Sequence, residues 1–306
     1  MSDILTRELL DEAEGFDPAP QQPPPPITPG THRRALGVPA WLRHTVVPVV
    51  AAAVLLLAVG FAVAPSVFAS GDPLVGVPAR KLQAPSAAHW FGTDNIGRDV
   101  YTRVVHGAGL SLTATLLAVG IALAVGSLIG LLSGAVGGAL DAVLMRIVDV
   151  LLSIPALLLS LALVTALGFG TVNVAVAVGV SLIANFARVM RSEVLRVRRS
   201  LYVEAAFASG VRWHTVLRRH VLRNSYAPVV ALAAVEFGMA VLAVSSLSFL
   251  GFGAVPPTPE WGSLISEGRN YLATAWWMTT LPGVVIVAVV LSAHRLGHAL
   301  ERREVR

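Results

Sequence analysis

The chain has 306 residues, of which 55% are hydrophobic and only 13% are charged, and its mean hydropathy is +0.71. Soluble domains carry about a quarter charged residues, so this composition excludes an ordinary water-soluble protein and indicates segments that lie in lipid. The absence of cysteine excludes disulfides and thiolate-bound metals. The formal net charge of +5 comes from arginines beside apolar segments, which is typical of membrane topology signals rather than of nucleic-acid binding.

Residues 1–42 precede or border the first apolar segment. Residues 1–17 carry six acidic residues against one arginine, and residues 18–39 are rich in proline. A secretory signal begins basic and soon turns apolar, so this segment does not read as a signal peptide. Proline removes backbone donors and favours an extended chain, so we predict a largely disordered tail.

The apolar segments that follow predict an all-α membrane protein with six transmembrane helices. Residues 150–187 are the difficult stretch, because they run for 38 residues without a charge. As one helix they would be about 57 Å long against a hydrocarbon core of about 30 Å, so we divide them at the turn 168–171. The predicted spans lie near residues 45–69, 109–135, 143–167, 172–190, 227–250 and 277–296. The second of these spans is rich in glycine, which suits close helix contacts in lipid.

The distribution of arginine predicts the orientation of these spans. Nine arginines lie between Arg188 and Arg223, and further arginines flank the first span and follow the last one. With six spans, all three basic segments lie on the same side. The positive-inside rule then places both termini, the loop 191–224 and the tail 301–306 in the cytoplasm. The loop 70–106 lies outside, and residues 107–300 form the helical core.

The loop 191–224 carries the most informative segment of the chain. Helix-forming residues lead up to Gly210, which can end a short helix by adopting a positive φ. A second short basic helix follows from Trp213. We therefore predict two short helices that meet at an elbow of small residues and form a compact knob that can fill a groove on another protein. The alternative is a basic helix that lies on anionic lipid.

The pattern of Glu204-Ala205-Ala206, then Gly210, then Leu222 resembles the cytoplasmic loop of ABC importer permeases. In that family the loop forms a coupling helix, which docks in a cleft of the cytoplasmic ATPase subunit. The resemblance therefore implies that these five residues couple the chain to an ATPase. Two positions depart from the family pattern, since Arg223 stands where a proline is usual and His220 where isoleucine is frequent.

Further motifs resemble the C-type permease subunit of dipeptide and oligopeptide importers. They occur in the family's order along the chain, at residues 91–100, 145–149, 248–253, 256–262 and 267–269. Taken without the resemblance, residues 92–99 are an ordinary turn built on Asx and glycine.

This resemblance implies a permease fold that moves peptides across the cytoplasmic, inner membrane. The implied partners are a homologous B-type permease, two cytoplasmic ABC ATPases and an extracytoplasmic substrate-binding protein. ATP and magnesium would be bound by the ATPases, and no cofactor or metal by this chain. Related importers move nickel chelates, so the solute stays open.

Charged residues inside the predicted spans are costly and need partners or water. Arg146 lies one helical turn before Asp149, so we predict that these two form a structural pair. Glu236 has no basic residue within a turn, and we expect it to face protein or the translocation path. Pro155 and Pro228 each remove a helical hydrogen bond and predict kinks in the third and fifth spans.

The sequence holds no phosphate-binding loop, since Lys81 is its only lysine and lies outside the spans. No arrangement of nucleophile and base indicates an enzyme. The pair His294 and His298 is interpreted as an interfacial helix face rather than a metal site. A self-powered secondary transporter remains the main alternative, although we find no repeat of the kind that such carriers show. A channel is a third alternative, but its pore calls for polar rings that the aliphatic spans lack.

Overall fold

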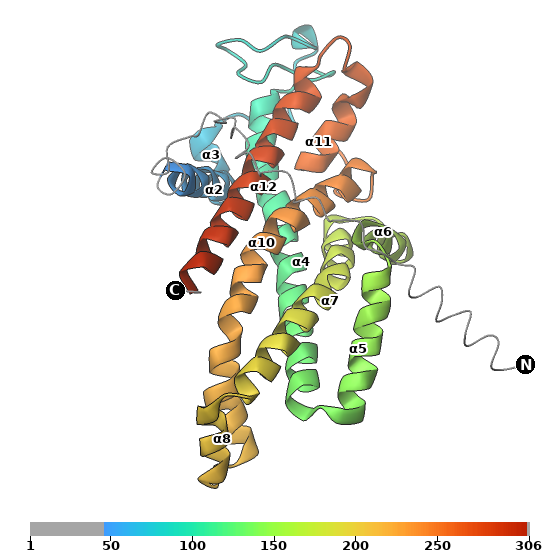
Figure 1. Cartoon of the computed structure of the whole chain (residues 1–306). Helices are drawn as coiled ribbons and strands as arrows, with labels where there is room; N and C mark the ends of the chain where they lie inside the picture. Colours follow the sequence, from blue (N-terminus) through green and yellow to red (C-terminus); the bar gives the residue numbers. More distant parts are fainter. Residues whose placement is uncertain (1–45, 305–306) are drawn as a thin grey trace, which may run out of the picture. The chain divides into compact units, whose positions relative to one another are not determined.

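The computed structural model describes residues 46–304, and the side chains up to residue 299. Within this part the regular structure is helical, apart from one isolated bridge between Thr93 and Asp99 (Figure 1). The predicted tail 1–42 and the end of the tail 301–306 lie outside the described residues. The all-α class is confirmed.

The helices follow the chain from one apolar segment to the next. Three elements are single turns outside the α-helical pattern: η2 (Pro78–Arg80), the π-helical η3 (Leu217–Leu222) and η4 (Arg269–Tyr271). The α-helices are α2 (Val47–Val63), α3 (Pro65–Phe68), α4 (Val100–Val136), α5 (Gly138–Ser153), α6 (Ala156–Leu167), α7 (Thr171–Arg198), α8 (Leu201–Ala208), α9 (Trp213–Val216), α10 (Arg223–Phe249), α11 (Trp261–Gly268) and α12 (Trp277–Glu304).

Four helical segments of the described chain are long and apolar enough to cross a membrane: α4, α7, the continuous stretch Trp213–Phe249, and α12. The pair α5 and α6 forms a fifth span if its two parts are counted together. The remaining predicted span, near residues 45–69, corresponds to α2, an apolar helix of 17 residues. The structure therefore supports four to five spans, and α2 decides whether there are six.

The predicted span 143–167 is not one helix but two, which meet at an angle of 95°. The break lies at Ile154 and Pro155, where Ile154 adopts an extended backbone with φ −98° and ψ 129°. Proline lacks an amide hydrogen and disfavours helical geometry in the residue before it, which accounts for the break. The predicted kink at Pro155 is confirmed in a sharper form, whereas Pro228 lies inside the continuous helix α10.

Helix α4 begins nine residues earlier than the predicted span at 109–135. Asp99 caps it, because its Oδ1 atom accepts a hydrogen bond of 2.7 Å from the amide of Thr102. The helix therefore extends for 37 residues, well beyond the length that a membrane requires. Its first turns pack with α11 and α12 in a cluster around the buried Trp261 and Trp277.

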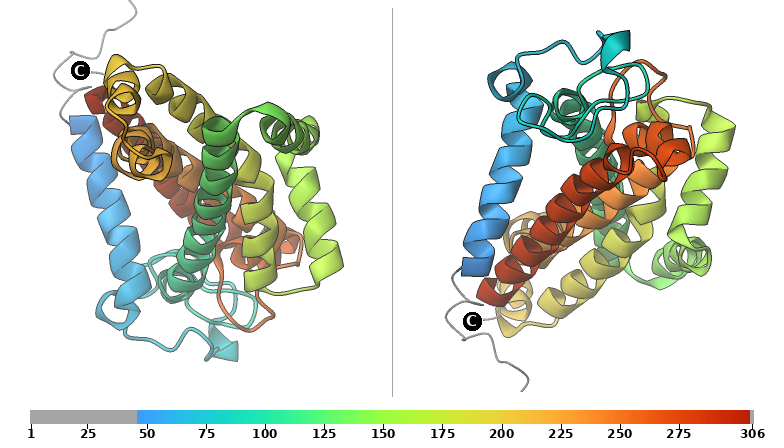
Figure 2. Two further views of the ribbon diagram at one scale, coloured as in Figure 1. Left: turned by 90° about the horizontal axis from the view of Figure 1, so that it is seen from below. Right: turned by 90° about the horizontal axis from the view of Figure 1, so that it is seen from above.

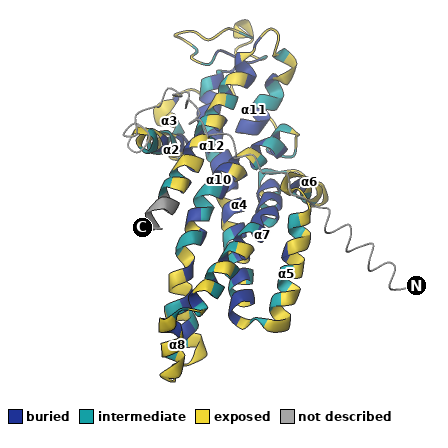
Figure 3. Ribbon diagram, in the orientation of Figure 1, coloured by how far each residue is buried: buried dark blue, intermediate teal, exposed yellow. Residues whose placement is uncertain are grey.

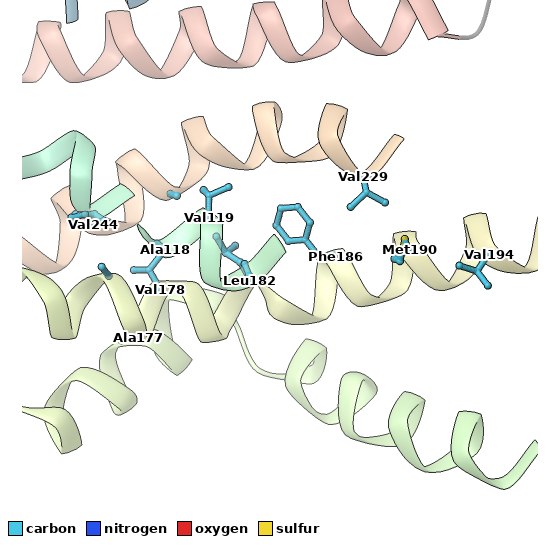
Figure 4. Close-up of a cluster of buried hydrophobic side chains, with 14 of the residues drawn as sticks. Ala118, Val119, Ala177, Val178, Leu182, Phe186, Met190, Val194, Val229 and Val244 are labelled. Carbon is cyan, nitrogen blue, oxygen red and sulfur yellow. The ribbon is translucent and has the colours of Figure 1, made fainter. Parts of the chain in front are cut away.

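The main hydrophobic core lies where α4, α7 and α10 pack together. Figure 4 shows Phe186 of α7 pointing toward α10, where Val229 lies, and both side chains are buried. The predicted role of the glycines is confirmed at three of four positions: Gly126, Gly130 and Gly134 contact α7 so closely that an added Cβ would collide with it. Gly120, by contrast, has nothing within 4 Å of that position.

Candidate functional site

The elbow predicted in the loop 191–224 forms in the structure at the end of α8. Gly210 adopts φ +77°, and its amide donates to the carbonyl of Phe207 at 2.9 Å. The amide of Val211 donates to the carbonyl of Ala206 at 3.1 Å. These two bonds are the Schellman motif, which ends a helix and requires a left-handed residue where Gly210 stands. The sequence pattern at 204–210 therefore corresponds to a helix with a fixed end.

The knob is anchored in the main core rather than hanging from the bundle. Val203, Val216 and Val221, from α8, α9 and η3, are each fully buried, and they belong to the same cluster as Val197 of α7. A segment with three buried aliphatic side chains in the core moves together with the helices that it contacts. The elbow therefore packs as part of the same core as α7 and α10.

The outward surface of the knob is largely exposed (Figure 3), and it combines apolar side chains with Glu204 and Arg212. Leu201 is 82% exposed, and Phe207 and Trp213 are about 40% exposed and stack on each other with ring centroids 6.1 Å apart. Glu204 and Ala205 are exposed between them along α8. Exposed large apolar residues grouped on a small projection are typical of a protein–protein contact. We name this surface, formed by residues 201–213, the elbow surface.

Leu222 is placed differently from the other predicted coupling residues. It ends η3, directly before α10, and is 38% exposed. Two residues earlier, the ring of His220 lies 6.2 Å from that of Tyr202, which joins η3 to α8. Leu222 therefore belongs to the helix that carries the elbow, not to the elbow surface itself.

Arg198 links the elbow to α4, a contact that the sequence alone did not reveal. Its Nη1 atom donates to the carbonyls of Gly134 and Ala135 at 2.6 and 2.9 Å, in the last turn of α4. The same guanidinium lies 5.5 Å from the ring centroid of Trp213. One cation thus satisfies free helix-end carbonyls and holds the aromatic face of the elbow.

A second group of charges is buried at the other end of α4. Arg103 is 1% exposed, and its guanidinium bonds both oxygens of Glu267 at 2.5 and 3.0 Å and Asp94 at 3.2 Å. Arg98 bonds the same two acids at 2.6 and 2.9 Å. Residues 92–99 are a turn, as the sequence predicts, because Asp94 also accepts from the amides of Ile96 and Arg98. Because Asp94 and Arg98 pair with Arg103 and Glu267, this turn also packs as part of the protein core.

Comparison with known proteins bears on these features directly. Residues 126–306, which include the elbow, match the family described as "Binding-protein-dependent transport system inner membrane component". This match covers more than half of the chain. The chain belongs to this family. It is therefore a multi-pass permease of the inner membrane.

Relatives of the permease carry related descriptions. The probable D,D-dipeptide transport system permease protein DdpC of Escherichia coli strain K12 is 39% identical over 76% of this chain and 78% of its own length. The dipeptide transport system permease protein DppC of Alkalihalophilus pseudofirmus is 37% identical over 73% of each chain. The glutathione transport system permease protein GsiD of Shigella flexneri is 43% identical over 71% of each. The resemblance to C-type permeases drawn from the sequence motifs is confirmed.

The prediction that Asp149 pairs with Arg146 is wrong. Asp149 of α5 accepts instead from Arg188 of α7, with 2.9 Å between Nη2 and Oδ1. Residues three apart on a helix can reach each other, but α7 packs beside α5 and places the guanidinium of Arg188 next to Asp149. A second salt bridge between α5 and α7 joins Arg191 to Asp141 through two bonds of 2.6 and 2.7 Å.

Glu236 faces protein, which is one of the two environments that the sequence predicts for it. Its side chain lies on α10, is 9% exposed, and accepts a hydrogen bond of 2.9 Å from Asn185 of α7. His294 and His298 lie on an exposed face of α12 with 3.1 Å between their Nε2 atoms. The described part of the permease holds no group of three or more residues that could bind a metal ion.

Proposed function

We propose that the permease is one of two membrane subunits of an ATP-driven peptide importer. Its partners in this proposal are a homologous B-type permease, two cytoplasmic ABC ATPases that bind ATP and magnesium, and an extracytoplasmic substrate-binding protein. The descriptions of the relatives as dipeptide and glutathione permeases support a peptide-like solute. The observation that carries the proposal is the anchored elbow, with an exposed apolar and acidic surface on buried supports.

The proposed topology has six spans, with α2 as the first and the bent pair α5–α6 as the third. At 17 residues, α2 reaches the lower limit for a helix that crosses a bilayer. In Figure 2 the start of α2, the end of α12 and the region of α8 lie toward one end, and the loop 70–99 toward the other. This arrangement supports an even number of spans, with both termini and the elbow in the cytoplasm.

The proposed mechanism is alternating access driven from the elbow surface. When ATP closes the ATPase dimer, the ATPase displaces α8, and Gly210 keeps the end of α8 fixed in shape. Because Val203 and Arg198 connect α8 and α9 with α7 and α4, the displacement reaches the membrane helices as a rigid-body motion. Glu204, Ala205 and Ala206 lie at the ATPase in this account, Leu222 carries the motion into α10, and Glu236 lies beside the solute route.

Replacing Glu204 by arginine tests the docking directly. Glu204 is the exposed acid of the elbow surface in a loop rich in arginine, so reversing its charge adds repulsion and removes the acid that the ATPase meets. We expect the ATPase subunits to stop co-purifying with the permease, and transport to fall at least about tenfold. Asp72→Arg makes the same charge reversal on the exposed loop 70–99 and is expected to leave co-purification intact.

Two outcomes contradict the proposal. One is unchanged co-purification and unchanged substrate-stimulated ATP hydrolysis in the Glu204→Arg complex at native expression. The other is uptake by the permease alone in liposomes, which indicates a self-powered carrier. Competition between a labelled dipeptide, other short peptides and a nickel chelate for uptake by the complete complex identifies the solute class.

A further inference from the structure

Helix α5 separates its exposed residues by chemistry into two neighbouring faces. Residues spaced by three and four lie above one another on a helix. The exposed polar residues follow this spacing: Arg146, Asp149 and Ser153. The residue directly after each of them is aliphatic and 40–55% exposed: Ile147, Val150 and Ile154, of which Ile154 directly follows the last residue of α5. Between these positions Val148 is buried and packs against Ala184 and Ala187 of α7. The helix therefore has one face for protein, one for an apolar neighbour and one for a polar neighbour.

Helix α7 carries a row of polar residues, of which Arg188 bonds the polar face of α5. Ser181, Asn185 and Arg188 follow the same spacing of four and three. Each bonds a polar partner on a different helix: Ser181 meets Ser160 of α6 at 3.0 Å, Asn185 meets Glu236 at 2.9 Å, and Arg188 meets Asp149 at 2.9 Å. Arg188 is also the one residue between 181 and 190 that is exposed. We name the side chains of Arg146, Asp149, Ser153 and Arg188 the polar seam.

The polar seam lies on α7 and on the bent pair α5–α6, which are apolar enough to lie in a membrane, so lipid is an unfavourable neighbour for its charges. Asp149 is the eleventh residue after Gly138, the first residue of α5, which is about 16 Å along the helix. The side chains of Asp149 and Arg188 are 57% and 60% exposed. An exposed charge on a membrane-spanning helix costs several kcal/mol in hydrocarbon and is favoured beside a water-filled cavity. The aliphatic face one residue further on α5 meets lipid or an apolar partner helix instead.

We propose that the polar seam lines the solute route and binds the carboxylate of the transported solute; this inference rests on the proposed function. The seam holds two guanidinium groups and one carboxylate, so it carries a net positive charge. Among the residues that the structure describes, Arg146 makes no ion pair, and its guanidinium is exposed one turn from Asp149. A guanidinium fork matches a carboxylate in two parallel hydrogen bonds, which an ammonium cannot do. The C-terminal carboxylate of a peptide is such a ligand.

The first test compares two adjacent cysteines in a chain that has none of its own. Ser153→Cys lies on the polar seam and Ile154→Cys on the aliphatic face, and both positions are exposed in this chain. Thiols react as thiolates, which form in water and not in hydrocarbon. In the assembled complex we expect a water-soluble thiol reagent to label Ser153→Cys at least about tenfold faster than Ile154→Cys. Equal rates, or faster labelling at Ile154→Cys, overturn the proposal.

The second test asks whether the seam recognises a carboxylate. A dipeptide at millimolar concentration, without the binding protein, is expected to slow labelling of Ser153→Cys about threefold or more, and the C-terminal amide of the same dipeptide is not. Adding Arg146→Gln should abolish this protection, whereas Arg80→Gln, which removes an exposed arginine from the loop 70–99, should leave it intact. Equal protection by the acid and the amide, no protection by either, or protection that survives Arg146→Gln overturns the proposal.

The two proposals fail in different ways. The labelling rate without peptide reports that each variant is assembled as in the native complex. ATP hydrolysis stimulated by the binding protein reports the importer function separately. If stimulation is absent in the native complex, the proposed function fails. If stimulation is present but the labelling pattern is absent, only the assignment of the polar seam fails.

Discussion

Replacing Arg103 by glutamine is expected to lower the free energy of unfolding by about 3–5 kcal/mol, because it removes a buried cation that pairs with Asp94 and Glu267. Arg103 is 1% exposed, and it is the residue that bonds both oxygens of Glu267 while also bonding Asp94. Arg98 remains, but one guanidinium cannot take the place of both. The measurement is thermal unfolding of the purified permease in detergent, read by size-exclusion chromatography after heating.

Two further variants show whether charge is the cause. Arg80→Gln removes an exposed arginine from the loop 70–99 and should change stability by about 0.5 kcal/mol at most. In the double variant Arg103→Met with Glu267→Met, Arg98 and Asp94 still pair at 2.6 Å, so most of the lost stability should return. An Arg103→Gln protein as stable as the native one would show that the buried cluster contributes nothing to the fold.

Replacing Gly130 by leucine is expected to separate α4 from α7 and to cost about 3 kcal/mol or more. A Cβ at Gly130 would collide with the backbone carbonyl of Ala187 and lie 2.8 Å from the Cβ of Met190, and neither neighbour can move without shifting α7. Gly120→Leu is the matched control, since that position is exposed and has nothing within 4 Å. The folded fraction after heating should fall for Gly130→Leu and stay unchanged for Gly120→Leu. Equal losses for the two variants would contradict close packing as the cause.

The sequence predicts those parts of the permease that depend on local chemistry. The length of an uncharged run shows whether it can cross a bilayer, so the main helices can be predicted from spacing alone. A glycine after a short helix can end that helix, so the elbow at Gly210 can be predicted in the same way. Pro155 predicts a break for the same reason. The angle of 95° depends on how α5 and α6 each pack against α7, which spacing does not contain.

Contacts between distant segments could not be predicted in this way. The local rule pairs Arg146 with Asp149, whereas packing provides Arg188, which lies 39 residues after Asp149 along the chain. The bond from Arg103 to Glu267 spans 164 residues, and Arg198 reaches carbonyls more than 60 residues before it. A single sequence carries no signal for such partners. Only the presence of charges in apolar or glycine-rich surroundings indicates that partners exist.

Labelling of a cysteine at Ser209 tests the central claim most directly, because Ser209 is exposed between α8 and Gly210. The account predicts that a membrane-impermeant thiol reagent reacts with Ser209→Cys in inside-out vesicles stripped of the ATPases. It also predicts that restoring the ATPases blocks the reaction and that intact cells are not labelled. Labelling of intact cells would place the elbow outside, and labelling that the ATPases do not change would leave the elbow without its partner.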